Sequence, residues 1–141
     1  MTHVVKSVLV DRPAAELFAL VDGCERYPEF LPWCTGTEVF ERTPEVTRAR
    51  LDIDYHGLKT HIATVNRKHP PDRIELALDD GPFEEFRGTW RFTSLGEEGC
   101  RVELEVDYEF ASASIAGLLR PAFAHILETL VDRFVARAES R

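Results

Sequence analysis

Apolar and polar side chains alternate through most of the segment from about residue 38 to residue 110. Such alternation is typical of β-strands with one buried and one solvated face. It is clearest near the end of this segment, where these residues share one face of two strands: Phe86, Gly88, Trp90, Phe92, Val102, Leu104, Val106, Tyr108 and Phe110. A turn between the two strands would place Arg91 opposite Glu103 and would also pair residues 87 and 107. We therefore expect an antiparallel sheet with a charged, solvated outer face.

Only one long helical pattern is available to cover the apolar face of this sheet. It begins at about Ser114, and these apolar residues recur along it with helical spacing: Ile115, Leu118, Leu119, Phe123, Ile126, Leu127, Leu130, Val131 and Phe134. A helix is about 10 Å across, whereas seven strands at about 4.8 Å spacing make a surface roughly three times wider. The sheet must therefore curl around the helix, and curling leaves room between them. Pro121 lacks a backbone donor, which predicts a kink near Gly117 and makes the first helical turn a candidate lid.

The N-terminal part predicts one strand and two short helices. Val4, Val8 and Val10 alternate with polar neighbours, and a short helix follows Pro13 over residues 14–21. Two prolines within residues 27–34 forbid a long regular element there, so we expect a loop or helical turn packed on an apolar surface. The expected order is one strand, two short helices, about six antiparallel strands and one long helix. This is an α+β fold, and we expect residues 1–141 to form a single domain.

A hairpin is predicted in the middle of the sheet. Residues 57–58 fit a two-residue turn with Gly at its first central position, which puts Asp54 opposite His61. The same register turns four side chains toward the inner face: Thr60, Ile62, Thr64 and Asn66. Buried polar groups need partners, and a cavity holding water or a ligand head group would supply them.

The expected cavity between helix and sheet has a defined set of candidate lining residues. From the sheet they are Leu51, Ile53, Tyr55, Phe86, Trp90, Phe92, Tyr108 and Phe110, and from the helix Leu119, Phe123, Ile126, Leu127 and Leu130. Phe30 and Trp33 would close its mouth. The alternative is that these side chains interlock as a filled core. The cavity prediction rests on the architecture rather than on any one side chain.

Composition and spacing argue against several classes of function. A net charge of −8 disfavours direct binding to DNA or RNA phosphates and to anionic membranes. The three cysteines and five histidines are scattered, with no spacing that suggests a disulfide framework, a metal site or a catalytic constellation. A pair of Asp54 with His61 would be solvated. The N-terminal residues predict no export signal, and no apolar stretch of about 18 residues predicts a transmembrane segment, so we expect a cytoplasmic protein.

Two motifs resemble a known family. They are Tyr27-Pro-Glu-Phe-Leu-Pro-Trp-Cys34 and Gly81-Pro-Phe-Glu-Glu-Phe-Arg-Gly-Thr-Trp-Arg-Phe92. Together they resemble the coenzyme Q-binding branch of the START-like helix-grip (polyketide cyclase, SRPBCC) superfamily, whose bacterial members include ribosome association toxins. The resemblance runs from about residue 4 to residue 138. It implies a helix-grip fold with a hydrophobic tunnel, the first motif near its mouth, and Trp90 with Phe92 in its wall.

The resemblance implies two functions that stay open. The first is non-enzymatic binding of ubiquinone or a related polyisoprenoid lipid, in support of respiratory quinone function, with no required cofactor and with transient contact at the inner membrane. The second is a ribosome-associated regulator that binds the large ribosomal subunit and inhibits subunit association. A third interpretation, a polyketide aromatase/cyclase-type enzyme, rests on fold analogy alone.

Overall fold

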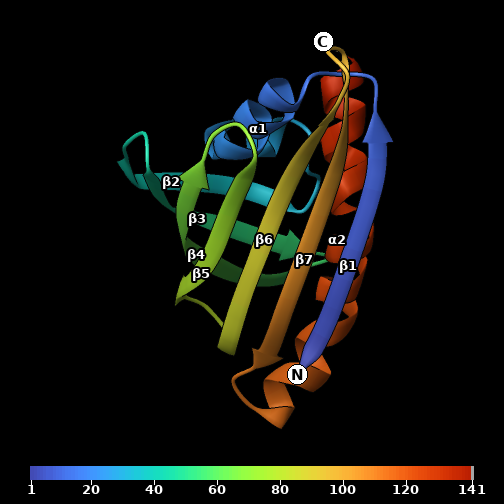
Figure 1. The fold of residues 1–141 in the computed structure, drawn as a ribbon. Helices are drawn as coiled ribbons and strands as arrows, with labels where there is room; N and C mark the ends of the chain where they lie inside the picture. The colour runs from blue at the N-terminus through green and yellow to red at the C-terminus, as the bar shows by residue number, and fades with distance from the viewer. Residues whose placement is uncertain (141) are drawn as a thin grey trace.

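A seven-stranded antiparallel sheet wraps around one long helix (Figure 1). The computed structural model describes residues 1–140. The elements are β1 (Thr2–Val10), α1 (Ala14–Asp22), the 3-10 helix η1 (Cys24–Glu29), β2 (Cys34–Arg42), β3 (Val46–Tyr55), β4 (Leu58–His69), β5 (Arg73–Asp80), β6 (Phe83–Leu95), β7 (Gly99–Phe110) and α2 (Ala113–Glu139). This order confirms the predicted α+β helix-grip fold.

The strands follow the order β1-β7-β6-β5-β4-β3-β2, so the first strand pairs with the last. In Figure 1, β1, β7 and β6 run alongside α2, while β2 and β3 cross behind them at a large angle. The sheet therefore bends around the helix, as a wide sheet with a narrow cover must. The core lies inside this bend.

The register of β6 and β7 matches the prediction. Arg91 pairs with Glu103 and Arg87 with Asp107 in the ladder. The Arg91 guanidinium nevertheless reaches diagonally to Glu105, with a distance of 3.1 Å between Nη1 and Oε1. All five predicted inner residues of β7 are buried.

The turn of the β3–β4 hairpin lies one residue earlier than predicted, which shifts the pairing of the two strands by two residues. The turn consists of His56 and Gly57, both with positive φ (53° and 87°), and Tyr55 pairs with Leu58. Positive φ at both central positions is what a type I′ turn requires, and Gly takes the second position rather than the first. The expected pairing of Asp54 with residue 61 is therefore wrong: Asp54 pairs with residue 59 and accepts a hydrogen bond from the Gly57 N–H at 2.9 Å. A shift of two residues keeps every side chain on its predicted face.

The long helix α2 is continuous from Ala113 to Glu139, including Pro121. Ser112 caps its start by accepting a hydrogen bond from the Ile115 N–H at 3.1 Å. The prediction that Leu118 lies on the apolar face of the helix is wrong, because this residue is 61% exposed. Contrary to the expectation that no stretch is long and apolar enough to span a membrane, α2 is so by length and composition. In the fold, its apolar face from Ala116 onward packs into the core.

Candidate ligand-binding site

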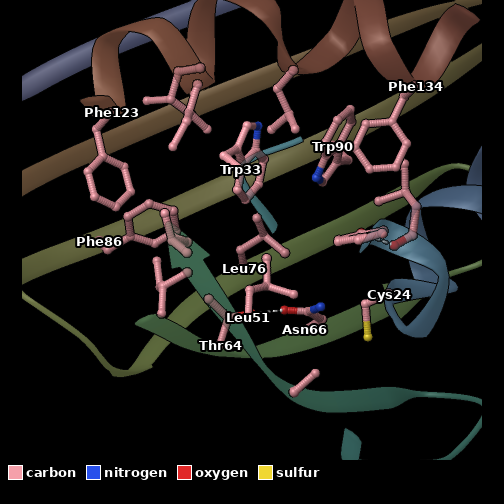
Figure 2. Close-up of a pocket in the computed structure, with 18 residues that line it drawn as sticks. Cys24, Trp33, Leu51, Thr64, Asn66, Leu76, Phe86, Trp90, Phe123 and Phe134 are labelled. Atoms are coloured by element: carbon pink, nitrogen blue, oxygen red, sulfur yellow. Dashed lines mark hydrogen bonds between the residues drawn. The ribbon is translucent and has the colours of Figure 1, made fainter. Parts of the chain in front are cut away.

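An apolar cavity of about 110 Å³ lies between α2 and the inner face of the sheet (Figure 2). It is lined from α1, η1 and the loop after them by Val21, Cys24, Tyr27 and Trp33, from β3 and β4 by Ala49, Leu51, Ile53, Ile62, Thr64 and Asn66, from β5 and β6 by Leu76, Phe86 and Trp90, and from α2 by Phe123, Ile126, Leu127, Leu130 and Phe134. The cavity therefore lies in the space between the bent sheet and the helix. A space there is what the greater width of the sheet predicts.

Nine of the fifteen candidate residues line this cavity: Trp33, Leu51, Ile53, Phe86, Trp90, Phe123, Ile126, Leu127 and Leu130. The other six are Phe30, Tyr55, Phe92, Tyr108, Phe110 and Leu119, and they contribute elsewhere.

Aromatic packing accounts for most of these six positions. Phe92 stacks on Trp90 and meets Phe18 of α1 edge-on, with ring centroids 5.8 Å apart. Tyr108 and Phe110 form a cluster around Phe83, whose ring lies 5.2 Å from that of Phe110. For these residues the filled-core alternative holds.

Phe30 and Tyr55 lie outside the cavity on different sides of it. Phe30 packs on Tyr27 and Phe134, each contact edge-on. Tyr55 packs against His125 on the outside of α2, with ring centroids 5.6 Å apart. Of the two residues predicted at the mouth, only Trp33 lines the cavity.

Some lining residues were not among the candidates. Leu76 and Phe134 belong to the predicted apolar faces of their strand and helix, so their patterns could have identified them. Val21, Cys24 and Tyr27 come from the short helices, and nothing in their spacing shows which part of the sheet those helices cover. Ala49 lines the cavity because its side chain is short, and the hairpin register predicted the inward direction of Thr64 and Asn66.

Polar groups are few in the cavity wall. The Thr64 hydroxyl donates to Asn66 Oδ1 at 2.6 Å, shown by the dashed line in Figure 2. The Trp33 Nε1–H is buried and has no partner in the described part of the chain. A buried donor without a partner costs about 1–3 kcal/mol. A ligand with an acceptor oxygen would recover that free energy.

The remaining ionisable groups of the wall are neutral near pH 7. Burial raises the pKa of the Cys24 thiol to about 11 and raises the pKa of Tyr27 well above its usual value. The Tyr27 hydroxyl donates to the backbone carbonyl of Val21. A protonated thiol is a poor nucleophile, so the wall offers a neutral, apolar surface rather than a reactive group.

Charged and metal-binding groups lie away from the cavity. Among residues 1–140 no three His, Cys, Asp or Glu side chains gather as a metal site. His61, expected opposite Asp54, instead contacts Asp80 at 2.8 Å on the exposed side of the sheet. That contact lowers the pKa of the Asp80 carboxyl.

Comparison with known proteins places this chain in a family. Residues 10–135 match the family described as polyketide cyclase / dehydrase and lipid transport. The chain is 38% identical to the ribosome association toxin RatA of Pseudomonas aeruginosa, over 98% of this chain and 96% of the relative. It is 28% identical to the mitochondrial coenzyme Q-binding protein coq10 of Schizosaccharomyces pombe, over 87% of this chain and 78% of the relative.

Solved structures share the fold. The Zhui aromatase/cyclase from a Streptomyces species has a TM-score of 0.85 at 19% identity, covering 99% of this chain and 94% of that one. A START superfamily protein from Mycobacterium smegmatis has a TM-score of 0.80 at 22% identity, covering 98% and 97%. The chain belongs to the polyketide cyclase / dehydrase and lipid transport family, with the START-like helix-grip fold, and is similar there to the ribosome association toxin RatA proteins.

Proposed function

We propose that residues 1–141 act as one domain that binds a hydrophobic ligand, ubiquinone or a related polyisoprenoid lipid, without catalysing a reaction. The observation that carries this proposal is the cavity between α2 and the sheet, with its apolar wall and few polar groups. Apolar pockets with a small number of placed polar groups are the usual form of small-molecule sites. The name of the coenzyme Q-binding relative supports a quinone as the ligand.

The size of the cavity limits how such a ligand would sit. An engineered apolar cavity of about 150 Å³ binds benzene, so about 110 Å³ corresponds to little more than one ring or a short branched chain. A longer isoprenoid would need side chains of the wall to move, or would leave part of itself outside. For a longer isoprenoid, the proposal treats the cavity as the inner end of the site.

Tryptophan fluorescence provides a direct test. The chain contains two tryptophans, and both Trp33 and Trp90 line the cavity. We expect ubiquinone with two isoprene units to quench this fluorescence saturably. Phe123→Ala should weaken the binding about tenfold, while Phe40→Ala, at an exposed position on β2, should leave it unchanged. Quenching that never saturates, or that responds equally to both substitutions, would contradict the proposal.

Association with the ribosome is the second candidate, and the 38% identity to a ribosome association toxin favours it. With a net charge of −8, the chain would contact basic ribosomal proteins more readily than RNA phosphates. We expect co-sedimentation with large ribosomal subunits that persists at moderate salt. Absence of co-sedimentation at low salt would refute this candidate.

The same proposal includes the absence of catalysis and a location in the cell. The aromatase/cyclase interpretation has support only in the fold, since the structural neighbours of that type are below 25% identity. Neither similar relative carries the name of an enzyme. For a carrier of a membrane-derived lipid we propose a cytoplasmic location with peripheral contact at the inner membrane.

A further inference from the structure

A second hollow, of about 280 Å³, lies on the surface beside the cavity. It is formed where the β3–β4 hairpin faces α2, and its lining residues are Pro32, Trp33, Asp54, Tyr55, His56, His125, Thr129 and Arg133. We call it the outer hollow. Trp33 lines both the outer hollow and the cavity, so this residue lies between them.

Trp33 is suited to be a movable wall. It is 7% exposed and lies in the turn between η1 and β2, outside every helix and strand. Its backbone is held because the Asp54 N–H donates to the Trp33 carbonyl at 2.9 Å. Its indole N–H, in contrast, has no partner within residues 1–140. Rotation of this side chain breaks no hydrogen bond.

Ile53 provides the comparison. It lines the cavity and another surface hollow, so it is also a wall between inside and outside. Ile53 lies on β3, which is paired on both sides, with Cys34 of β2 and Thr60 of β4 as the partners of Ile53. Passage at Ile53 would require strands to separate, whereas passage at Trp33 requires one side chain to rotate.

The hydrogen-bond donors of the outer hollow suit an anionic group. Arg133 projects from α2 and forms no ion pair with any of residues 1–140. The imidazoles of His56 and His125 add further N–H donors. The one carboxylate that lines the hollow, Asp54, keeps its negative charge, but it is held by the Gly57 N–H at 2.9 Å and forms no ion pair with Arg133. A guanidinium without a carboxylate partner, beside two imidazoles, matches a phosphate group.

We propose that the outer hollow binds the phosphate head of an isoprenoid lipid whose tail enters the cavity, and that Trp33 is the gate between the two. This rests on the proposed function, because the tail needs the cavity. It also explains how a cavity of this size could hold such a lipid. The cavity holds the part of the apolar tail next to the head group, and the outer hollow holds the head group. The site then selects by head group among lipids with the same tail.

The test compares geranyl phosphate with geraniol, which share one tail and differ in the head, by the change in tryptophan fluorescence that binding next to Trp33 and Trp90 produces. We expect the wild-type chain to bind geranyl phosphate about tenfold more tightly than geraniol. Arg133→Gln should remove that tenfold preference and leave geraniol binding unchanged. Arg120→Gln, an exposed arginine on the same helix but outside both spaces, should change neither ligand.

The outcomes separate the two proposals. If geraniol binds and Arg133→Gln has no effect on geranyl phosphate, the outer subsite is wrong and cavity binding stands. If Arg120→Gln weakens geranyl phosphate as much as Arg133→Gln, the effect is general charge and the subsite is also wrong. If neither ligand binds, the outer subsite is wrong, and the ubiquinone titration alone decides the binding proposed for the cavity.

The gate has its own readout, the dissociation rate. Trp33→Ala should speed the release of geraniol about tenfold, because the wall is gone, and Trp33→Phe should change it much less. In both variants the signal would come from the remaining Trp90. Equal release rates in Trp33→Ala and wild type would overturn the gate.

Discussion

Lys68 is a buried cation whose charge is balanced by one carboxylate. Its side chain is 5% exposed, and its Nζ lies 3.1 Å from Oδ2 of Asp22 at the end of α1. The hydroxyl of Thr47, a fully buried residue of β3, donates to the other carboxylate oxygen at 2.8 Å. Taken together, these contacts fasten α1 to β3 and β4 next to Val21 and Cys24 of the cavity wall.

Loss of Lys68 should be costly, because it leaves a largely buried carboxylate without its cation. For Lys68→Met we expect the free energy of unfolding to fall by about 3 kcal/mol, measured by urea denaturation. Lys59→Met, at an exposed position on the same strand, should change it by less than about 0.5 kcal/mol. Equal effects of the two substitutions would show that the buried pair contributes no more than a surface charge.

The buried thiols predict a loss of stability in alkali. The pKa of Cys24 and the pKa of Cys34 are each raised to about 11, mainly by burial. An unfolded cysteine ionises at about 8.5, so above that pH the unfolded chain loses these protons while the folded chain keeps them. The contribution is complete below about pH 8.5 and is lost as the pH rises toward 11. We expect the urea midpoint to fall over this range, and to fall less in Cys24→Ala; the same fall in both would contradict this assignment.

At the scale of elements, the type I′ turn of the β3–β4 hairpin positions residues that line both the cavity and the outer hollow. It sets the register that turns Thr64 and Asn66 inward, and it places His56 at the outer hollow. Gly57 has φ of 87°, a conformation that costs other residues about 1–2 kcal/mol. The turn therefore depends on this glycine rather than on contacts, since nothing lies within 4 Å of an added Cβ.

Two glycine substitutions should have opposite effects. Gly57→Ala should lower the free energy of unfolding by about 1 kcal/mol, because of its positive φ. Gly117→Ala, exposed in α2 and equally free of neighbours, should raise it by about 0.5–1 kcal/mol, because alanine loses less backbone entropy in a helix. Thermal or urea denaturation measures both, and a stabilising Gly57→Ala would rule out the I′ turn.

Helices and strands could be predicted where their pattern of apolar residues extends over many positions. The alternation of β6 and β7 and the apolar face of α2 identify most of their large buried residues, because burial on one face imposes a period on the sequence. The buried alanines of α2, Ala116, Ala122 and Ala138, were not identified. The hairpin turn was misplaced by one residue, and the strand pairing by two, because a glycine suits the first central position of one turn type and the second of another. Leu118 fits the helical period but points away from the core, although Ala116 before it and Leu119 after it are buried.

At the scale of the whole molecule, the existence of the cavity could be predicted and its boundary could not. The width of the sheet relative to the helix predicts a space, and that requires no knowledge of any single contact. Which aromatic residues fill the space depends on how α1 and η1 dock: Phe92 is covered by Phe18, and Tyr27 reaches the cavity from η1. These are contacts between segments far apart in the sequence, and no local period encodes them.

Filling the cavity should separate the two candidate functions. Ala49 lies in the cavity wall on β3 and is 5% exposed, so Ala49→Leu adds three carbon atoms to the empty space. We expect the free energy of unfolding to rise by up to about 2 kcal/mol, from about 0.8 kcal/mol per buried methylene, and quinone binding to weaken at least tenfold. Ala77→Leu, on the exposed face of β5, is the matched control and should change neither.

The ribosome measurement then decides how the two functions are related. If co-sedimentation with large subunits is unchanged in Ala49→Leu, the outer surface acts independently of the cavity. If it falls together with quinone binding, the ligand controls the surface that meets the ribosome, through the Trp33 segment that borders both. A substitution that abolishes co-sedimentation while quinone binding stays intact would instead locate the ribosome contact directly, and the acidic outer face of β6 and β7 is where we would begin.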